Sequence, residues 1–234
     1  MTILFNQAKT AEQILADATL VAYYSMDCLS YTSLDSGPNQ IHGITNDLNS
    51  GDGGRIGQSY LFNSNSSYFQ ASGFVLLGQS YRPYSFAMWL RPLVTTSGTI
   101  VHISQTAIGT GWCVQFIGFN STGRIIINSI TTGNALVPIF GPVLKMGEWV
   151  HIAQTYSQTN GLRLYVNGVL YEQTSAFPYA ASGVPMIMTL GQPLSGGYCA
   201  RSLINTGQYY GQIDEFYLFS RELTHADVTA LAQP

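Results

Sequence analysis

Short runs of β-branched and aromatic residues fill the chain from Leu20 onward, separated by Gly, Ser, Asn and Pro at intervals of about ten residues. This spacing is typical of an antiparallel sandwich or jelly roll. The 234 residues suffice for one such domain, because all-β sandwiches run to roughly 200–250 residues as a single unit. We therefore expect an all-β fold: a two-sheet antiparallel jelly-roll sandwich with short helices near both termini.

Ten runs stand out as expected strands. They are Leu20–Tyr24, Tyr60–Phe62, Tyr84–Arg91, Thr99–Ile103, Trp112–Phe119, Arg124–Asn128, Trp149–Tyr156, Leu162–Val166, Val169–Gln173 and Gln212–Phe219. Nearly every position is apolar in 86–91 and 215–219, so these two strands are expected at the centre, with both faces covered. Asn167-Gly168 joins two alternating runs and predicts a two-residue type I′ hairpin turn.

Helical signals occur only at the two ends of the chain. Residues 10–18 open with a Thr cap and contain helix formers, which predicts a short helix. Thr224 and Asp227 have capping-box spacing, which predicts one or two helical turns before the C-terminus. We divide the chain into an N-terminal extension, residues 1–18, and a sandwich domain, residues 19–234.

The chain carries few charges. Only 9% of its residues are charged, the net charge is −3, and its nine Lys and Arg are nowhere clustered. Such a surface does not favour nucleic acid or anionic lipid as partners, and no run of about 18 apolar residues predicts membrane insertion. The surface must be rich in hydroxyl and amide groups, as is common in secreted proteins. Because the first residues do not resemble a secretory signal, we expect a domain of a larger extracellular or cell-surface protein.

The three cysteines allow two interpretations. In an oxidising compartment Cys113 and Cys199 are able to pair, which leaves Cys28 as a buried thiol; in the cytosol all three would stay reduced. Asn65-Ser66-Ser67 and Asn120-Ser121-Thr122 match the glycosylation acceptor pattern and agree with an extracellular location, although the pattern is common by chance.

Five stretches, in this order, resemble the laminin-G-like jelly-roll branch of the concanavalin A-like lectin and glucanase superfamily. They are residues 20–27 (LVAYYSMD), 35–43 (DSGPNQIHG), 84–92 (YSFAMWLRP), 147–153 running on to 164–168 (GEWVHIA, LYVNG) and 211–223 (GQIDEFYLFSREL). The resemblance implies that the first and last strands lie side by side and that Trp89 and Trp149 are core rings. Members bind glycans, cell-surface proteins or lipids, and a minority hydrolyse polysaccharides, so the fold leaves the function open.

The resemblance also implies a structural calcium ion near the paired terminal strands. The matching positions are Asp27, Asp35 and Asp214, with Asn39 or the loop carbonyls of residues 36–43 as helpers, and oxygen ligands of this kind suit Ca²⁺. The alternative is that Asp27 and Asp35 only accept hydrogen bonds from turn amides.

Catalytic residues are not evident. A polysaccharide hydrolase needs two carboxylates facing one scissile bond, whereas the adjacent Asp214 and Glu215 are expected on opposite faces of their strand because side chains alternate. Gln40-Ile41-His42 matches a fragment of alginate lyases, but the arginine-rich strand those enzymes need is missing, so His42 is assigned to the 35–43 loop. His102 and His151 lie in apolar strands and are expected to be satisfied core histidines.

A binding face is predicted from aromatic and amide residues in turn-rich segments. Trp112, Tyr198, Arg201, Tyr209 and Tyr210 are the candidate ligand-binding residues, and the loops 109–112 and 131–134 are expected beside Tyr198 on the sandwich rim. The leading hypothesis is a non-catalytic recognition module for glycans. The alternatives are a protein adhesion module of the same fold and, third, a polysaccharide hydrolase.

Overall fold

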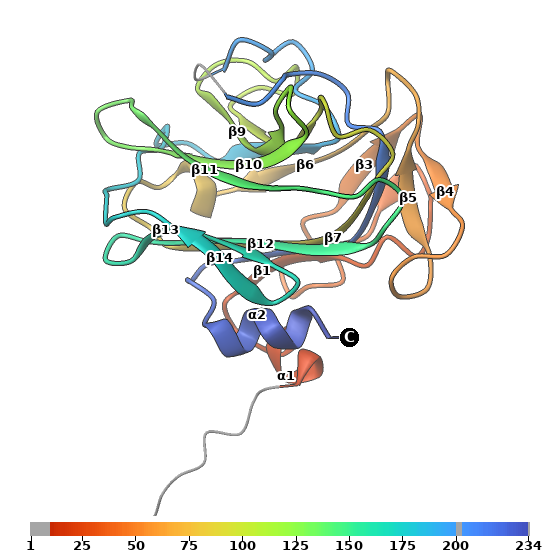
Figure 1. Ribbon diagram of the computed structural model, residues 1–234, viewed down its shortest axis with the longest axis horizontal. Helices are drawn as coiled ribbons and strands as arrows, with labels where there is room; N and C mark the ends of the chain where they lie inside the picture. Colours follow the sequence, from red (N-terminus) through yellow and green to blue (C-terminus); the bar gives the residue numbers. More distant parts are fainter. Residues whose placement is uncertain (1–9, 200–202, 234) are drawn as a thin grey trace, which may run out of the picture.

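The computed structural model describes residues 10–199 and 203–233 and consists of two antiparallel sheets packed face to face (Figure 1). The first sheet runs in the order β14-β13-β12-β7-β16-β5-β4, and β1 pairs with β16. Its strands are β1 Leu20–Tyr24, β4 Asn49–Gly51, β5 Ser59–Phe62, β7 Tyr84–Pro92, β12 Val150–Ser157, β13 Gly161–Val166, β14 Val169–Gln173 and β16 Gly211–Phe219. The first and last strands therefore lie side by side, as the resemblance implied.

The second sheet runs in the order β11-β10-β9-β8-β15-β6-β3-β2. Its strands are β2 Thr32–Ser33, β3 Gly43–Asn46, β6 Tyr68–Phe74, β8 Thr99–Ser104, β9 Cys113–Phe119, β10 Arg124–Ile130, β11 Leu136–Val143 and β15 Met186–Leu190, and a 3-10 turn, η1, covers Leu76–Gly78. Each of the ten expected runs is a strand. The predicted list lacked β2, β3, β4, β6, β11 and β15, which are short or contain Gly or Pro.

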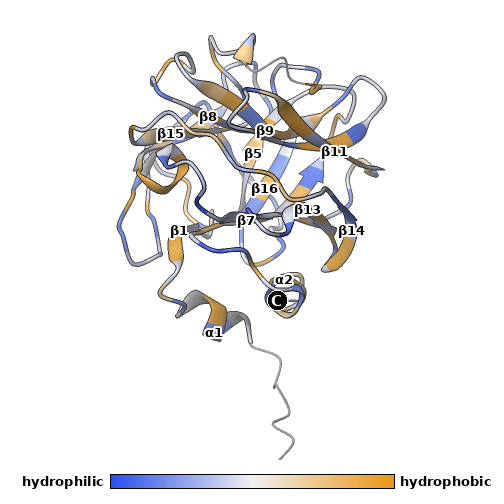
Figure 2. Cartoon of the chain, turned by 90° about the vertical axis from the view of Figure 1, so that its left-hand side faces the viewer, coloured by the Kyte–Doolittle hydropathy of each residue, from blue (hydrophilic) through white to orange (hydrophobic). Residues whose placement is uncertain are grey.

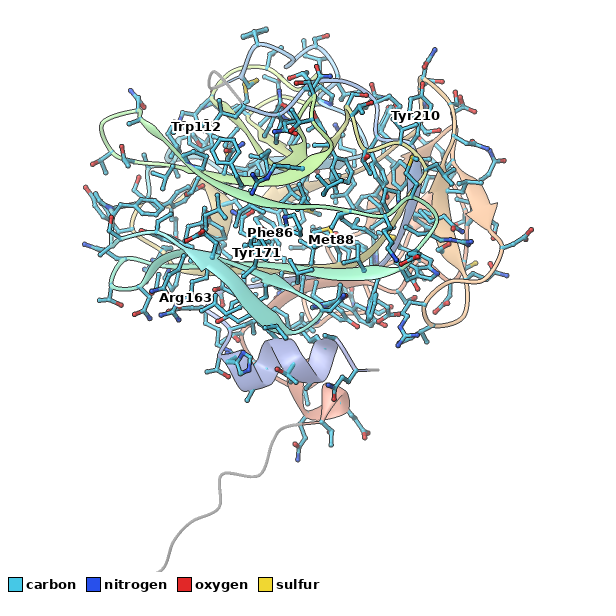
Figure 3. The ribbon with its side chains drawn as sticks, viewed as in Figure 1. Phe86, Met88, Trp112, Arg163, Tyr171 and Tyr210 are labelled. Atoms are coloured by element: carbon cyan, nitrogen blue, oxygen red, sulfur yellow. A yellow bond between two sulfur atoms is a disulfide. The ribbon has the colours of Figure 1, made fainter. Side chains whose placement is uncertain are left out.

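The core between the sheets is aromatic. Phe86 of β7 and Met88 project into it (Figure 3), and Tyr84 contacts Phe116 and Tyr179 at ring-centroid distances of 5.5 and 5.2 Å. Such edge-on ring contacts contribute about 0.5–1.5 kcal/mol each beyond the area they bury. β7 and β16 are buried on both faces at the middle of their sheet, which confirms the expectation for the two apolar runs.

Both helices cover the outer face of the first sheet (Figures 1 and 2). Thr10 and Gln13 form a capping box that starts α1, Ala11–Leu15, and Thr224 with Asp227 forms a second that starts α2, His225–Leu231. Both predicted caps are confirmed. Ile14 is fully buried in a small apolar cluster on this face, so the segment after residue 10 packs against the sandwich.

One turn and two tryptophan rings test the finer expectations. Asn167 and Gly168 have φ values of 50° and 80°, the positive angles that a type I′ turn requires, so the hairpin between β13 and β14 is confirmed. Trp89 is buried, but Trp149 is only partly buried, at the rim of a surface recess beside Lys145 and Glu148. The expectation of a core ring at Trp149 was wrong because this residue precedes its strand and lies outside the sheet.

Candidate carbohydrate site

A recess of about 510 Å³ lies where three connections of the second sheet meet. The β8–β9 loop contributes Gly111, the β10–β11 hairpin contributes residues 134–136, and the long β15–β16 loop contributes Tyr198. Cys113, Ile130 and Cys199 complete the lining. The loops 109–112 and 131–134 were predicted to lie beside Tyr198, and one residue of each, Gly111 and Asn134, does line the recess with it. Strand β11, which forms one wall, was not predicted.

Glycine and threonine shape the two shorter loops. Gly109 and Gly111 adopt φ values of 85° and 83°, which side chains rarely tolerate, and the Thr106 hydroxyl accepts a hydrogen bond from the backbone N–H of Thr110. At the hairpin tip Asn134 adopts a φ of 57° and donates its N–H to the carbonyl of Thr131 at 2.9 Å. Both walls of the recess are thus held by local hydrogen bonds before any ligand binds.

A disulfide fixes the third wall. Cys113 at the start of β9 is bonded to Cys199, with a Cα–Cα distance of 5.4 Å, so Tyr198 is held next to a residue anchored on the sheet. Cys28, which we expected to be a buried thiol, is exposed. That expectation failed because Cys28 lies in the irregular segment after β1 rather than within a strand.

The described part of the lining combines an aromatic ring, aliphatic groups and an amide, and none of these residues is charged. Tyr198 is 70% exposed, so its ring is available to a ligand. Ile130 and Leu136 supply apolar surface, and Asn134 supplies an amide. Recesses that bind small molecules are commonly apolar with a few polar groups that fix orientation. The described lining suits a ligand that offers both a flat apolar face and hydroxyl groups.

The other candidate residues do not join this recess. Tyr209 is fully buried, and its hydroxyl donates to the carbonyl of Gln212, so its assignment to a binding face was wrong: it is a core ring. Figure 3 shows Trp112 and Tyr210 on opposite sides of the molecule. Trp112 packs partly against the core, and Tyr210 donates its hydroxyl to Asn65. Arg201 lies outside the described residues.

A buried polar layer lies beside the disulfide. Gln115 is buried and accepts hydrogen bonds from the hydroxyls of Thr99 and Thr206, at 3.0 and 3.1 Å. His102 is also buried, and one ring nitrogen bonds the carbonyl of Gly109 at 2.8 Å, while Nδ1 has no partner. Burial lowers the pKa of His102 to about 4, so its ring is neutral at pH 7. The sequence signal for this layer was a polar residue within an otherwise apolar strand, as at His102 and Gln115.

The family match and the shared fold are consistent with this description. A model described as the concanavalin A-like lectin/glucanases superfamily matches residues 63–229. The chain belongs to this superfamily. No curated protein sequence matches it.

Solved structures of the superfamily fold include both carbohydrate- and protein-bound domains. Domain 4 of AbnA, a GH43 extracellular arabinanase from Geobacillus stearothermophilus, in complex with arabinotriose, is 22% identical, with a TM-score of 0.63 over 92% of this chain and 98% of that chain. The binding domain of Paraclostridial Mosquitocidal Protein 1 is 17% identical (TM-score 0.67, 92% and 52%). The binding domain of botulinum neurotoxin DC, in complex with rat synaptotagmin II, is 14% identical (TM-score 0.62, 92% and 51%). The chain thus spans about half of each toxin binding domain.

The calcium ligands that the superfamily resemblance implied are used in other ways. Asp35 accepts three backbone N–H groups, those of Tyr23, Gly37 and Ile41, at 2.8–2.9 Å. Asn39 donates its amide to the carbonyl of Val21. The carboxylates of Asp27, Asp35 and Asp214 do not form a group within 4.8 Å of one another among the described residues. The three carboxylates therefore do not converge on one point, and the bonds of Asp35 match the alternative role in turns.

A β-bulge changes the expected geometry of the adjacent acids. Register shifts between Asp214 and Tyr217, and Glu215 adopts a φ of 52°. Asp214 pairs with Trp89 and Tyr217 with Ala87, two residues apart on one face of β7, and Glu215 accepts the hydroxyl of Tyr217. Both acids thus project to the outer face of the sheet, and the expectation of opposite faces was wrong because a bulge breaks the alternation.

Burial dominates the electrostatics of these acids. Burial raises the pKa of Asp214 to about 7, and the nearby charge of Glu215 acts in the same direction. Hydrogen bonds from the backbone N–H groups of Ile56 and Arg55 act in the opposite direction but do not outweigh burial. Glu215 is bonded to the hydroxyls of Tyr23 and Tyr217. Both carboxyl groups are buried and have protein partners, and neither lines the recess.

His42 and His151 both have structural positions. His42 is exposed, and its Nδ1 accepts the backbone N–H of Asp35 at 3.1 Å, so it belongs to the 35–43 loop as expected. His151 is buried against Trp89, at 5.3 Å between ring centroids, but neither of its ring nitrogens has a partner. The expectation of a satisfied core histidine was wrong for His151, and burial lowers its pKa to about 3.

Proposed function

We propose that this chain is a non-catalytic extracellular recognition module that binds uncharged carbohydrate in the recess beside Tyr198. The observation that carries the proposal is the exposed Tyr198 ring at a preformed recess whose lining includes aliphatic groups and the Asn134 amide. The apolar C–H face of a sugar ring packs on an aromatic face, while amides and backbone groups hydrogen-bond its hydroxyls. The arabinotriose complex of a domain with the same fold supports this ligand class.

The lining also supports a binding role rather than hydrolysis. Among the described residues, neither a carboxylate nor a histidine lines the recess, whereas hydrolysis of a glycosidic bond requires two acids about 5–10 Å apart across it. Asp214 and Glu215 project from the outer face of the first sheet. There Asp214 accepts the backbone N–H of Arg55, and Glu215 accepts the hydroxyl of Tyr217. None of the described lining residues is charged, which favours neutral sugars over uronates.

The decisive experiment is calorimetric titration of the chain with arabinotriose and a panel of other neutral oligosaccharides, alongside an oligogalacturonate. Tyr198→Ala should weaken binding of a neutral sugar at least tenfold, equivalent to about 1.4 kcal/mol. Tyr171→Ala is the matched control, because Tyr171 is 46% exposed on the edge strand β14 and does not line the recess. Absence of binding to every neutral sugar, or equal binding by both variants, contradicts the proposal.

A second candidate is adhesion to a protein. Exposed apolar side chains gather where the edge strands of the two sheets, β11 and β14, lie next to each other, and they include Val143, Val169 and Tyr171. The synaptotagmin complex of a toxin domain with this fold supports the class of partner. Loss of partner binding by Val169→Asp, with sugar binding unchanged, would favour this function.

A further inference from the structure

The disulfide forms part of the recess itself. Cys113 and Cys199 both line it, yet they are only 8% and 2% exposed. A reductant that reaches these sulfurs from the recess must occupy the space that a bound ligand would fill. Access to the disulfide and occupation of the recess therefore compete for one volume.

The same disulfide holds Tyr198 in place. The β15–β16 loop is anchored before it by the N–H of Ser195, which donates to the carbonyl of Ile108, and after it by the N–H of Asn205, which donates to the carbonyl of Phe119. Between these two anchors, Cys199 is the covalent attachment of the loop to β9. The N–H of Cys199 donates to the carbonyl of Gly196, which is a bond within the segment itself.

We propose that ligand binding and reduction of the Cys113–Cys199 disulfide oppose each other, so that reduction weakens the site and a bound ligand protects the disulfide. This inference rests on the carbohydrate site proposed above. Reduction releases the Tyr198 wall from β9 and lowers affinity, while a bound sugar shields the sulfurs. Because linkage is reciprocal, the factor by which reduction weakens binding equals the factor by which the ligand disfavours reduction at equilibrium.

The chemistry requires an external dithiol. A thiolate of the dithiol attacks one protein sulfur, the protein S–S bond breaks, and a mixed disulfide forms. The second thiolate of the reductant then displaces the protein sulfur. The products are the oxidised cyclic disulfide of the reductant and two protein thiols, so two electrons and two protons pass from the dithiol to the protein.

The test uses the chain with Cys28→Ser, which removes the exposed thiol and leaves the recess unchanged. Dithiothreitol is added with and without arabinotriose, and free thiols are alkylated and counted by mass spectrometry. At a sugar concentration of 100 times Kd we expect reduction to slow about 100-fold, the factor by which the free form is depleted. Titration of the reduced chain, and of the Cys113→Ser/Cys199→Ser variant, should give at least tenfold weaker binding than the oxidised chain.

A second readout needs no sugar. Hydrogen exchange of the amides at 196–199 should accelerate at least tenfold on reduction, while those of β9 and β10 stay protected, which shows that the sandwich remains folded. Equal exchange in both states, unchanged affinity after reduction, or equal reduction rates with and without bound sugar overturns the switch. If the oxidised chain does not bind arabinotriose or any other neutral sugar, the proposed function fails instead, and the exchange result still decides whether the disulfide holds the loop.

Discussion

Cys113 and Cys199 are bonded across a sequence separation of 86 residues, and this link joins the first residue of β9 to the loop that carries Tyr198. A cross-link that closes a loop of this length restricts the unfolded chain and stabilises the fold by about 4 kcal/mol in the chain-entropy model. The structure thus gives the disulfide two effects, one on the global stability and one on the wall of the recess.

We expect the Cys113→Ser/Cys199→Ser variant to lose about 4 kcal/mol of unfolding free energy, measured by urea denaturation with a two-state fit. Cys28→Ser is the control, and it should change stability by less than about 0.5 kcal/mol because Cys28 is an exposed, unpaired thiol. A double variant as stable as the parent would show that the link does not constrain the unfolded chain.

Tyr198 and Tyr209 should separate binding from stability. Tyr209 is fully buried, with its ring 5.9 Å from that of Phe62, so Tyr209→Ala should cost about 3–5 kcal/mol of unfolding free energy. Tyr198 is exposed, and Tyr198→Ala should change stability by less than about 0.5 kcal/mol while it weakens sugar binding. Urea denaturation and calorimetry on both variants check this. A large stability loss for Tyr198→Ala would mean that this ring is structural.

The sequence was informative wherever local chemistry decides the structure. Capping at Thr10 and Thr224, the Asn167-Gly168 turn and the apolar runs of β7 and β16 are each set by neighbouring residues, and all were found. Strand β11 was missed because Pro and Gly interrupt its pattern. Its partner strand β10 supplies the pairing that its own composition does not indicate.

The candidate site was only partly predictable. Tyr198 and the neighbouring loops were expected together, but Tyr209 and Tyr210 were grouped with them because they are close in sequence. The loop that carries Tyr198 leads from β15 of the second sheet to β16 of the first, and at its end Tyr209 enters the core and Tyr210 lies beside Asn65. Exposure of an aromatic ring depends on tertiary packing and has no local sequence signal in a chain this rich in tyrosine.

Arg221 should make the protein sensitive to strong acid. It donates to Asp17 at 2.7 Å and to Asp227 at 2.6 Å, which ties the N-terminal segment to α2. Burial raises the pKa of both acids, but hydrogen bonds outweigh it: those from Thr19 and Arg221 lower the pKa of Asp17 to about 2, and those from Arg221 and Thr224 lower that of Asp227 to about 2.

Since these folded-state pKa values lie below the unfolded value near 4, the stabilisation is present above about pH 4 and is lost as the pH falls toward 2. Arg221→Gln should cost about 2 kcal/mol at pH 7 and should flatten the loss of stability between pH 4 and 2. Melting temperatures at several pH values measure both effects. An unchanged acid profile in the variant would contradict the assignment.

Asp35 distinguishes a turn role from calcium binding. Its two oxygens accept the N–H groups of Tyr23, Gly37 and Ile41, so Asp35→Ala leaves three backbone donors without their partner and should cost about 2–3 kcal/mol. We expect the same fall in melting temperature with calcium and with chelator. A fall confined to the calcium buffer would instead indicate an ion bound to the folded state, since only that state gains from the ligand.

Asp214 should make the free energy of unfolding change with pH in the opposite direction to Asp17 and Asp227, the partners of Arg221. Burial raises its folded-state pKa to about 7, whereas an unfolded aspartate titrates near 3.9. Between about pH 4 and 7 the unfolded chain therefore binds fewer protons than the folded chain, and the free energy of unfolding decreases as the pH rises through this window.

Asp214→Asn cannot titrate, so this part of the slope should disappear. The amide keeps one acceptor oxygen, so the variant loses some of the hydrogen bonds from Arg55, Ile56 and Glu215 and is less stable overall. The pH dependence is therefore the readout, from urea denaturation at intervals between pH 4.5 and 7.5. Glu215, whose pKa is also raised by burial, contributes a slope of the same sign in both proteins. Identical slopes would show that Asp214 is ionised in the folded chain throughout this range, held as a carboxylate by its backbone donors.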